Sequence, residues 1–271
     1  MSIYAHNIHT HAFLIAFFQY TVNLMSDNHL DTHLLAKMRR QNHISWQIYA
    51  WVFFKSKFLA SEATTNDVHD HMKRARADNL YQLLSDEEKE QADMKAFREY
   101  VRHKWRPTKQ YPSAVRSTYV SRLNFENKLY HYWDSLLGPD KKIEAKQSEL
   151  VHGQFGLFSA CDDFTIPRDV KYIWGDLHPV NCNDEEWEDY HKQYSSCFQA
   201  ELQMKRKYLY SGPASLANHH CTKSQLSVAS GDSVAVSGSK RFKKGEEIFF
   251  HYGEHYFTQE NPCTCCKESN T

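Results

Sequence analysis

The N-terminal half of the chain has the 3.6-residue hydrophobic spacing that is typical of amphipathic helices. Leu30, Leu34 and Met38 fall on one helical face. The first part of the run 44–59 is apolar nearly all round, which indicates a helix that is buried on every side. The pattern predicts a helical region over residues 1–147.

Two helices in this half have recognisable ends. Ser85 followed by Glu88 is a capping-box signature, because the serine hydroxyl can accept from the third helical amide while the glutamate reaches back to the serine amide. The helix that begins there is predicted to run to about Trp105, where an Arg-Pro pair follows. A second helix is predicted over 113–137, and Gly138, the first glycine of the chain, ends it.

From about residue 149 the pattern changes to short segments rich in β-branched and aromatic residues. The acidic run 184–189 suits a helix N-terminus, and we expect that helix to continue to about Lys207. A Gly-Asp pair at 231–232 predicts a hairpin turn. The sequence therefore predicts an α+β protein whose second part is built from short strands. The strand-like segments are 155–158, 169–176, 225–229, 233–237 and 246–250.

The amino-acid composition is ordinary for a globular protein and does not by itself indicate a function. The chain has 271 residues, of which 41% are hydrophobic and 24% charged, and its 33 Lys+Arg balance its 33 Asp+Glu. Net charge therefore says nothing about partners. The apolar stretch 12–25 is too short and too polar for a membrane span, and no basic residue precedes it as in a secretory signal. We expect no membrane partner and a reducing compartment in which the seven cysteines stay free, some of them on a metal.

Residues 95–133 combine basic and aromatic side chains. This segment has nine Lys/Arg, only two acidic residues and nine aromatic residues. If its cations contact phosphates and its rings stack on bases, the segment is a nucleic-acid-binding surface. The same composition is also expected of amphipathic helices whose rings form the core and whose cations are solvated. Both interpretations stay open.

The C-terminal part contains three motifs in a fixed order. The first is Gly-Pro-Ala-x-x-x-Asn-His-x-Cys at 212–221, the second is Gly-Glu-Glu-Ile-Phe-Phe-His-Tyr-Gly at 245–253, and the third is Cys-x-Cys-Cys at 263–266. With the glycines near residue 155, this order resembles that of SET-domain protein-lysine methyltransferases. Tyr194 and Phe257 extend the similarity toward the branch that modifies lysine 20 of histone H4.

The resemblance implies a domain organisation and a cofactor. Residues 1–147 would form a helical region, 148–258 a SET-type fold of short strands with a helical insert, and 259–271 a cysteine-rich post-SET tail. The cofactor would be S-adenosyl-L-methionine. Its binding residues would be Gly153, Gln154, Phe155, Gly156, Tyr194, Asn218 and His219.

The resemblance also assigns a catalytic residue and a substrate channel. Tyr252 would orient the lysine amine at the point of methyl transfer, where positioning supplies most of the catalysis. Phe250 and Phe257 would line the lysine channel with it. A Phe at position 250 removes a hydroxyl that would hold a water, which favours di- or trimethyl products.

The cysteines suggest zinc, which takes four sulfur or nitrogen ligands in a tetrahedron. The resemblance implies that Cys221 and the tail cysteines Cys263, Cys265 and Cys266 form this site and fold the tail over the cofactor. Unliganded thiols are the alternative.

Two functions from different classes follow. The first is a nuclear methyltransferase that acts on histone or another basic peptide, with nucleosomal DNA as a further partner through Lys95–Trp133; a cytoplasmic location is the alternative. The second is a catalytically inactive SET fold that binds chromatin or nucleic acid. This second hypothesis rests on departures from the family pattern: Thr222-Lys223-Ser224 replaces a Pro-Asn, two residues separate the glycines, and His251 precedes Tyr252.

Overall fold

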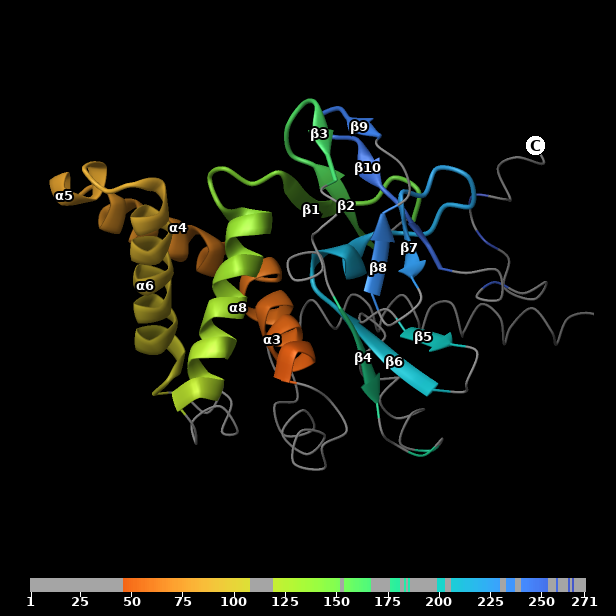
Figure 1. Cartoon of the computed structure of the whole chain (residues 1–271), viewed down its shortest axis with the longest axis horizontal. Coiled ribbons are helices and arrows are strands. Elements are labelled where there is room, and N and C mark those ends of the chain that lie inside the picture. Colours follow the sequence, from red (N-terminus) through yellow and green to blue (C-terminus); the bar gives the residue numbers. More distant parts are fainter. Residues whose placement is uncertain are drawn as a thin grey trace, which may run out of the picture.

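The protein is α+β, with helices in the N-terminal part and short strands after them (Figure 1). A cysteine cluster lies near the C-terminus. This arrangement confirms the predicted fold class. The computed structural model describes residues 46–107, 119–151, 154–166, 176–180, 183, 185, 199–202, 206–229, 233–236, 240–252, 257, 263 and 265. The helical face predicted at Leu30, Leu34 and Met38 lies outside these residues.

The helix predicted from Ser85 to Trp105 is present with its predicted ends. Glu88 N donates to Ser85 Oγ at 3.4 Å and Ser85 N donates to Glu88 Oε2 at 2.9 Å, so the capping box is present and its helix ends at Trp105 as predicted. No helix in the described ranges is long and apolar enough to cross a membrane. The elements are α3 (Trp46–Phe54), the π-helix η1 (Lys55–Leu59), α4 (Glu62–Arg76), α5 (Asn79–Gln82), α6 (Asp86–Trp105) and α8 (Tyr119–Leu137).

Gly138 ends α8 because only glycine fits there. Its N–H donates to the carbonyl of Trp133 at 2.8 Å, and a Cβ at this position would come within 2.5 Å of the carbonyl oxygen of Asp134. The predicted C-terminus of this helix is therefore confirmed. The expected start near residue 113 lies outside the described residues.

Helix α3 lies at the centre of the hydrophobic core, as its all-round apolar sequence predicts. Its residues from Ile48 to Phe54 are all buried, and it contacts α8 on one side and strand β6 (Arg206–Ser211) on the other (Figure 1). The Trp51 ring meets the Tyr132 ring of α8 edge-on at 4.9 Å. A single cluster of buried residues runs from this helix to the strands that carry the C-terminal motifs.

Three small sheets make up the rest of the described chain. Their orders are β1-β2-β10, β11-β7-β8-β4-β6-β5 and β3-β9. The strands are β1 (Ile143–Gln147), β2 (Phe155–Ser159), β3 (Phe164–Thr165), β4 (Asp176–Val180), β5 (Gln199–Leu202), β6, β7 (Leu226–Ala229), β8 (Ser233–Val236), β9 (Arg241–Phe242), β10 (Glu247–Ile248) and β11 (Phe250–His251).

Two hairpins organise these sheets. Strands β7 and β8 pair antiparallel, with Val228 opposite Val234, which confirms the hairpin predicted from the Gly-Asp pair between them. Strands β1 and β2 also pair antiparallel, with Ala145 opposite Leu157. The expected domain boundary at 147/148 falls inside this second hairpin, so β1 is joined to the strand region by its hydrogen bonds.

The helix predicted to reach Lys207 is wrong over its last part. Residues 199–202 and 206–211 are β5 and β6, which pair antiparallel, and β6 also pairs with β4 on its other side. Tyr208, Leu209 and Tyr210 favour a strand, and the ladders on both sides of β6 satisfy its backbone groups. Most of the remaining predicted helix lies outside the described residues.

Candidate functional site

The two longest C-terminal motifs lie side by side. The carbonyl of Asn218 accepts from the Phe250 amide at 2.8 Å, and His219 forms a parallel β-bridge with Phe250. Beside this pairing, Phe250 of β11 is opposite Leu226 of β7 in a parallel ladder. The 310 helix η2 (Pro213–Leu216) leads directly into this segment. The pairing holds Asn218 and His219 next to the Phe250–Tyr252 strand end, as the resemblance implies.

Glu247 joins three of the segments that surround this point. Asn218 Nδ2 donates to Glu247 Oε1 at 2.9 Å and to the Phe155 carbonyl at 3.3 Å. Ser148 Oγ donates to the two carboxylate oxygens of Glu247 at 2.9 and 3.2 Å. Asn218 is only 5% exposed, and both of its amide hydrogens are used inside the protein. Its side chain therefore holds β2 and β10 together, and a cofactor contact through its main chain stays a prediction.

Glu247 also packs against the glycine-containing start of β2. A Cβ at Gly156 would collide with the Glu247 carboxylate, so packing within the protein explains this glycine. The carbonyl of Gln154 accepts from the Ser148 amide at 2.8 Å, and that of Phe155 accepts from Asn218. Cofactor contacts by this segment stay a prediction. Gly153 and Tyr194 lie outside the described residues.

The three predicted channel residues lie together. The Tyr252 ring is 5.9 Å from the Phe250 ring and 6.3 Å from the Phe257 ring, to which it is nearly parallel. The Tyr252 hydroxyl donates to the carbonyl of Ala217 at 3.0 Å, which fixes the direction of its proton. The backbone amide of Tyr252 donates to His219 Nδ1 at 3.2 Å.

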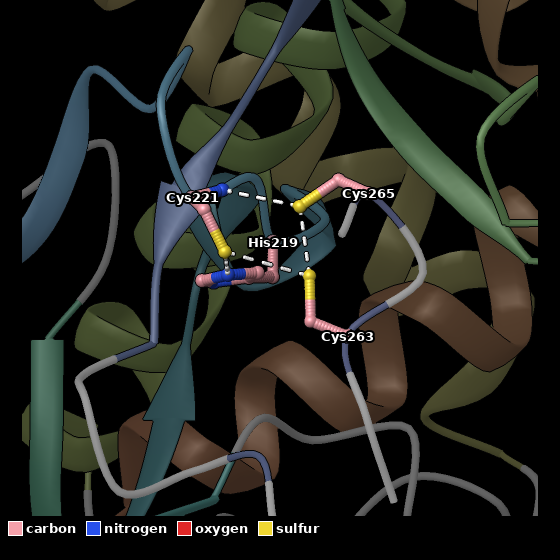
Figure 2. A group of neighbouring side chains, drawn as sticks. All are labelled: His219, Cys221, Cys263 and Cys265. Carbon is pink, nitrogen blue, oxygen red and sulfur yellow. Dashed lines mark hydrogen bonds between the residues drawn. The ribbon is translucent and has the colours of Figure 1, made fainter. Parts of the chain in front are cut away.

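His219, whose ring centroid lies 5.4 Å from that of Tyr252, belongs to a cluster of possible metal ligands. Figure 2 shows the four side chains of this cluster. The ligand atoms of His219, Cys221, Cys263 and Cys265 are all within 4.8 Å of one another. His219 Nε2 lies 3.1 Å from Cys221 Sγ, which lies 3.5 Å from Cys263 Sγ. Cys263 Sγ lies 2.7 Å from Cys265 Sγ, and the cysteines are free thiols. Three thiols at this spacing fit a zinc site by their chemistry.

The membership of the cluster differs from the predicted ligand set. Cys221, Cys263 and Cys265 come together as predicted, while Cys266 lies outside the described residues. His219, predicted only as a cofactor residue, is the fourth member of the cluster. The His-x-Cys spacing of 219–221 was the sequence signal that could have indicated this. Burial raises the pKa of the Cys265 thiol, and a bound cation acts in the opposite direction because coordination favours the thiolate.

The His219 ring is enclosed by other rings. The centroids of Phe257, His251 and Tyr252 lie 4.7, 5.3 and 5.4 Å from it. Burial, helped by the neighbouring His251 and His220, lowers the pKa of His219 to about 4. The ring is therefore neutral near pH 7.

The basic and aromatic segment 95–133 belongs mainly to α6 and α8. Its described rings at 97, 100, 105, 125, 130, 132 and 133 are all buried in the core, so they cannot stack on bases. Among its cations, Arg102 pairs with the fully buried Glu126 and Arg98 donates to Asn127. The described part of this segment thus fits the amphipathic-helix interpretation, and nucleic-acid binding by residues 95–133 stays a prediction.

No family model matches the chain. Over 99 residues, or 36% of the chain, the sequence is 31% identical to the histone-lysine N-methyltransferase set9 of Aspergillus terreus and to that of Emericella nidulans. It is 30% identical to the protein of the same name from Aspergillus oryzae. The aligned part spans only 15–16% of the length of these relatives.

Two solved structures show weak similarity. A candidate histone methyltransferase of Plasmodium falciparum gives a TM-score of 0.27 at 19% identity, over 43% of this chain and 97% of that one. The methyltransferase domain of human PR domain-containing protein 2 gives a TM-score of 0.26 at 11% identity, over 46% and 86%. The sequence similarity to histone-lysine N-methyltransferases is the finding that bears on function.

Proposed function

We propose that the chain is a SET-type protein-lysine N-methyltransferase that uses S-adenosyl-L-methionine and acts on histone or another basic peptide. We propose lysine 20 of histone H4 as the modified residue because of the motif resemblance, and a nuclear location follows from such a substrate. The observation that carries the proposal is the position of Tyr252. Its hydroxyl is held against the segment that carries Asn218 and His219, beside the aromatic rings of Phe250 and Phe257.

The hydrogen bond from Tyr252 to Ala217 suits a residue that orients an amine. Because the phenolic proton points to the Ala217 carbonyl, the oxygen would act as an acceptor, not as a donor, toward a substrate amine. A lysine N–H that donates to this oxygen would have its own lone pair turned away from Tyr252. Such fixed orientation is the main contribution that a protein makes to a direct displacement.

The rings next to Tyr252 favour the neutral amine. Desolvation disfavours the ammonium form of lysine, so a channel lined by Phe250 and Phe257 would lower the pKa of the substrate amine. With Phe rather than Tyr at position 250, no hydroxyl holds a water beside the amine. We therefore propose di- or trimethyl products. A product ladder that stops at monomethyl-lysine, read by mass spectrometry, would contradict this part.

The cofactor supplies the methyl group from its sulfonium when bound. The main chain of Asn218 and His219, the segment from Gly153 to Gly156, and Tyr194 are the proposed binding groups. The Asn218 side chain contributes indirectly, because its amide holds β2 against β10. Zinc is the proposed metal of the cluster, with Cys221, Cys263 and Cys265 as ligands and Cys266 as the proposed fourth.

A catalytically inactive SET fold that binds chromatin is the second candidate. The observation that favours it is that the Asn218 amide and the Gln154 and Phe155 carbonyls are used inside the protein. The departure at Thr222–Ser224 favours it as well. A binding module needs neither a fixed Tyr252 hydroxyl nor bound cofactor, so the two candidates differ in what they bind.

The test is transfer of a labelled methyl group. The protein is incubated with labelled S-adenosyl-L-methionine and nucleosomes, free histones or unrelated basic proteins. Tyr252→Phe is expected to lower the rate by at least about 100-fold, because it removes a group aimed at the reacting centre. Tyr81→Phe is the control, since its hydroxyl bonds to Asp93 in the helical half.

Two outcomes would count against the proposal. Absence of transfer to every substrate, together with absence of cofactor binding by calorimetry, would leave the inactive binding module as the better explanation. Normal transfer by Tyr252→Phe would remove Tyr252 from the reaction while leaving the enzyme class intact.

A further inference from the structure

The two ring nitrogens of His219 have different partners, and together they decide where its proton lies. Nδ1 faces the backbone amide of Tyr252 at 3.2 Å. A backbone N–H can only donate, so Nδ1 must accept and cannot carry a hydrogen. A neutral imidazole has one protonated nitrogen, which leaves the hydrogen on Nε2. That nitrogen lies 3.1 Å from Cys221 Sγ, so it donates to the sulfur.

This assignment separates His219 from the metal ligands. An imidazole binds a metal through a nitrogen that carries no hydrogen, and the only such nitrogen of His219 is already turned to Tyr252. The three cysteine sulfurs of the cluster are then the proposed ligands. His219 instead resembles the outer partners that orient and stabilise metal ligands by hydrogen bonding.

We propose that His219 is a positioning residue that couples the cysteine metal centre to Tyr252. On one side its Nε2–H donates to Cys221 Sγ and stabilises the thiolate. On the other side its Nδ1 holds the main chain of Tyr252. The Tyr252 half of this inference rests on the proposed function, whereas the Cys221 half does not.

The surroundings of His219 make this coupling rigid. The ring is only 7% exposed, and the rings of Phe257, His251 and Tyr252 lie around it. Rotation of the imidazole would require these rings to move. If Cys221 moves when the metal binds or leaves, the imidazole must move with it because it cannot rotate on its own. The movement therefore reaches the Tyr252 amide.

The hydrogen position can be measured directly. In protein with nitrogen-labelled histidine and cadmium in place of zinc, long-range proton–nitrogen NMR spectra should show His219 as the Nε2–H tautomer. Scalar coupling between cadmium and a His219 nitrogen would prove direct ligation and overturn the proposal. The Nδ1–H tautomer would overturn it too.

Two substitutions separate the two contacts. Asparagine places an amide oxygen near the position of Nδ1, so His219→Asn keeps an acceptor for the Tyr252 amide but does not reach Cys221. Glutamine places its amide nitrogen near the position of Nε2, so His219→Gln keeps a donor for Cys221 but gives up the acceptor for Tyr252. His103→Gln is the control, because this histidine is on the exposed face of α6.

The two variants should fail in opposite ways. His219→Asn should lower metal affinity by about 10- to 100-fold in a chelator competition, with the hydrogen-exchange protection of the Tyr252 amide retained. His219→Gln should retain metal affinity, lose that protection and lower kcat with little change in KM for the cofactor. Equal losses in both variants would mean a merely structural role and overturn the inference. Metal affinity and amide protection can be measured even if the protein transfers no methyl group. A failure of the proposed function can therefore be distinguished from a failure of this inference.

Discussion

The helical half and the C-terminal site are held together in different ways. In the helical half, rings pack on rings: Trp51 meets Tyr132 at 4.9 Å, and Phe53 meets Trp105 at 5.5 Å. In the C-terminal site, polar side chains connect segments that are far apart in the sequence. Asn218 reaches Phe155 and Glu247, and His219 reaches Tyr252.

Because of this difference, the helical half should contribute mainly to stability and the C-terminal site mainly to activity. Apolar contacts in the helical half are numerous and do not depend on direction, so each large ring contributes to the free energy of unfolding. Hydrogen bonds in the site each contribute little net stability but fix positions. Substitutions in the first region should therefore change stability most, and those in the second should change activity more than stability.

The largest expected effect on stability is that of Trp51→Ala. Trp51 is fully buried between α8 and the rest of α3, and truncation of such a ring costs about 3–5 kcal/mol through lost contacts and a cavity. Urea denaturation should show this loss in the free energy of unfolding.

A matched substitution sharpens this prediction. The Trp51 indole N–H has no hydrogen-bond partner within the described part of the chain. Trp51→Phe removes that buried donor and keeps most of the ring volume, so it should cost much less than Trp51→Ala. Equal losses for the two variants would mean that the ring volume is not what stabilises this helix. Leu83→Ala, on a side chain that is 82% exposed, should change nothing measurable.

The contrast also explains which features could be predicted from the sequence. The capping box of α6 and the burial of α3 depend on neighbouring residues, so local patterns predicted both. The hairpin of β7 and β8 was predictable for the same reason. Strand β6 was not, because its pairing with β4 and β5 outweighed the expected helix.

Prediction of the candidate site was uneven for a similar physical reason. The motifs indicated that Asn218, His219 and Tyr252 belong together, and the described structure brings them into contact. The sequence predicted Glu247 only as a residue of a strand. Nothing in the sequence indicated that its side chain joins β2 to Asn218. The second contact of His219, with Cys221 two residues further on, was missed because the His-x-Cys spacing was interpreted only as part of a cofactor motif.

Gly156→Ala should affect the site more than the fold. The added Cβ would displace the Glu247 carboxylate and thereby disturb its bonds to Asn218 and Ser148. Such overpacking costs about 1–3 kcal/mol, and methyl transfer should fall by more than this loss of stability explains. Thermal unfolding and the labelled transfer assay measure the two effects on the same preparation.

Gly245→Ala is the control for Gly156→Ala. Gly245 has a φ of +81°, and a Cβ there would meet no atom within 4 Å. The substitution strains the backbone without touching Glu247, so it should lower stability by about 1–2 kcal/mol and leave transfer nearly unchanged in the folded protein. If both glycine variants lose activity in proportion to stability, the Glu247 network has no special part in the site.

Ser85→Ala should give the smallest effect, and one confined to the helical half. Ser85 caps α6 through its hydroxyl and its amide, and loss of such a cap costs about 1 kcal/mol. Ser85→Asp supplies another acceptor at the same position and should restore most of that stability. Because α6 lies on the side of α8 that is away from the strands (Figure 1), neither variant should alter transfer by the folded protein. A loss of transfer at full stability would show that the helical half shapes the site directly, and the separation between the two regions would then fail.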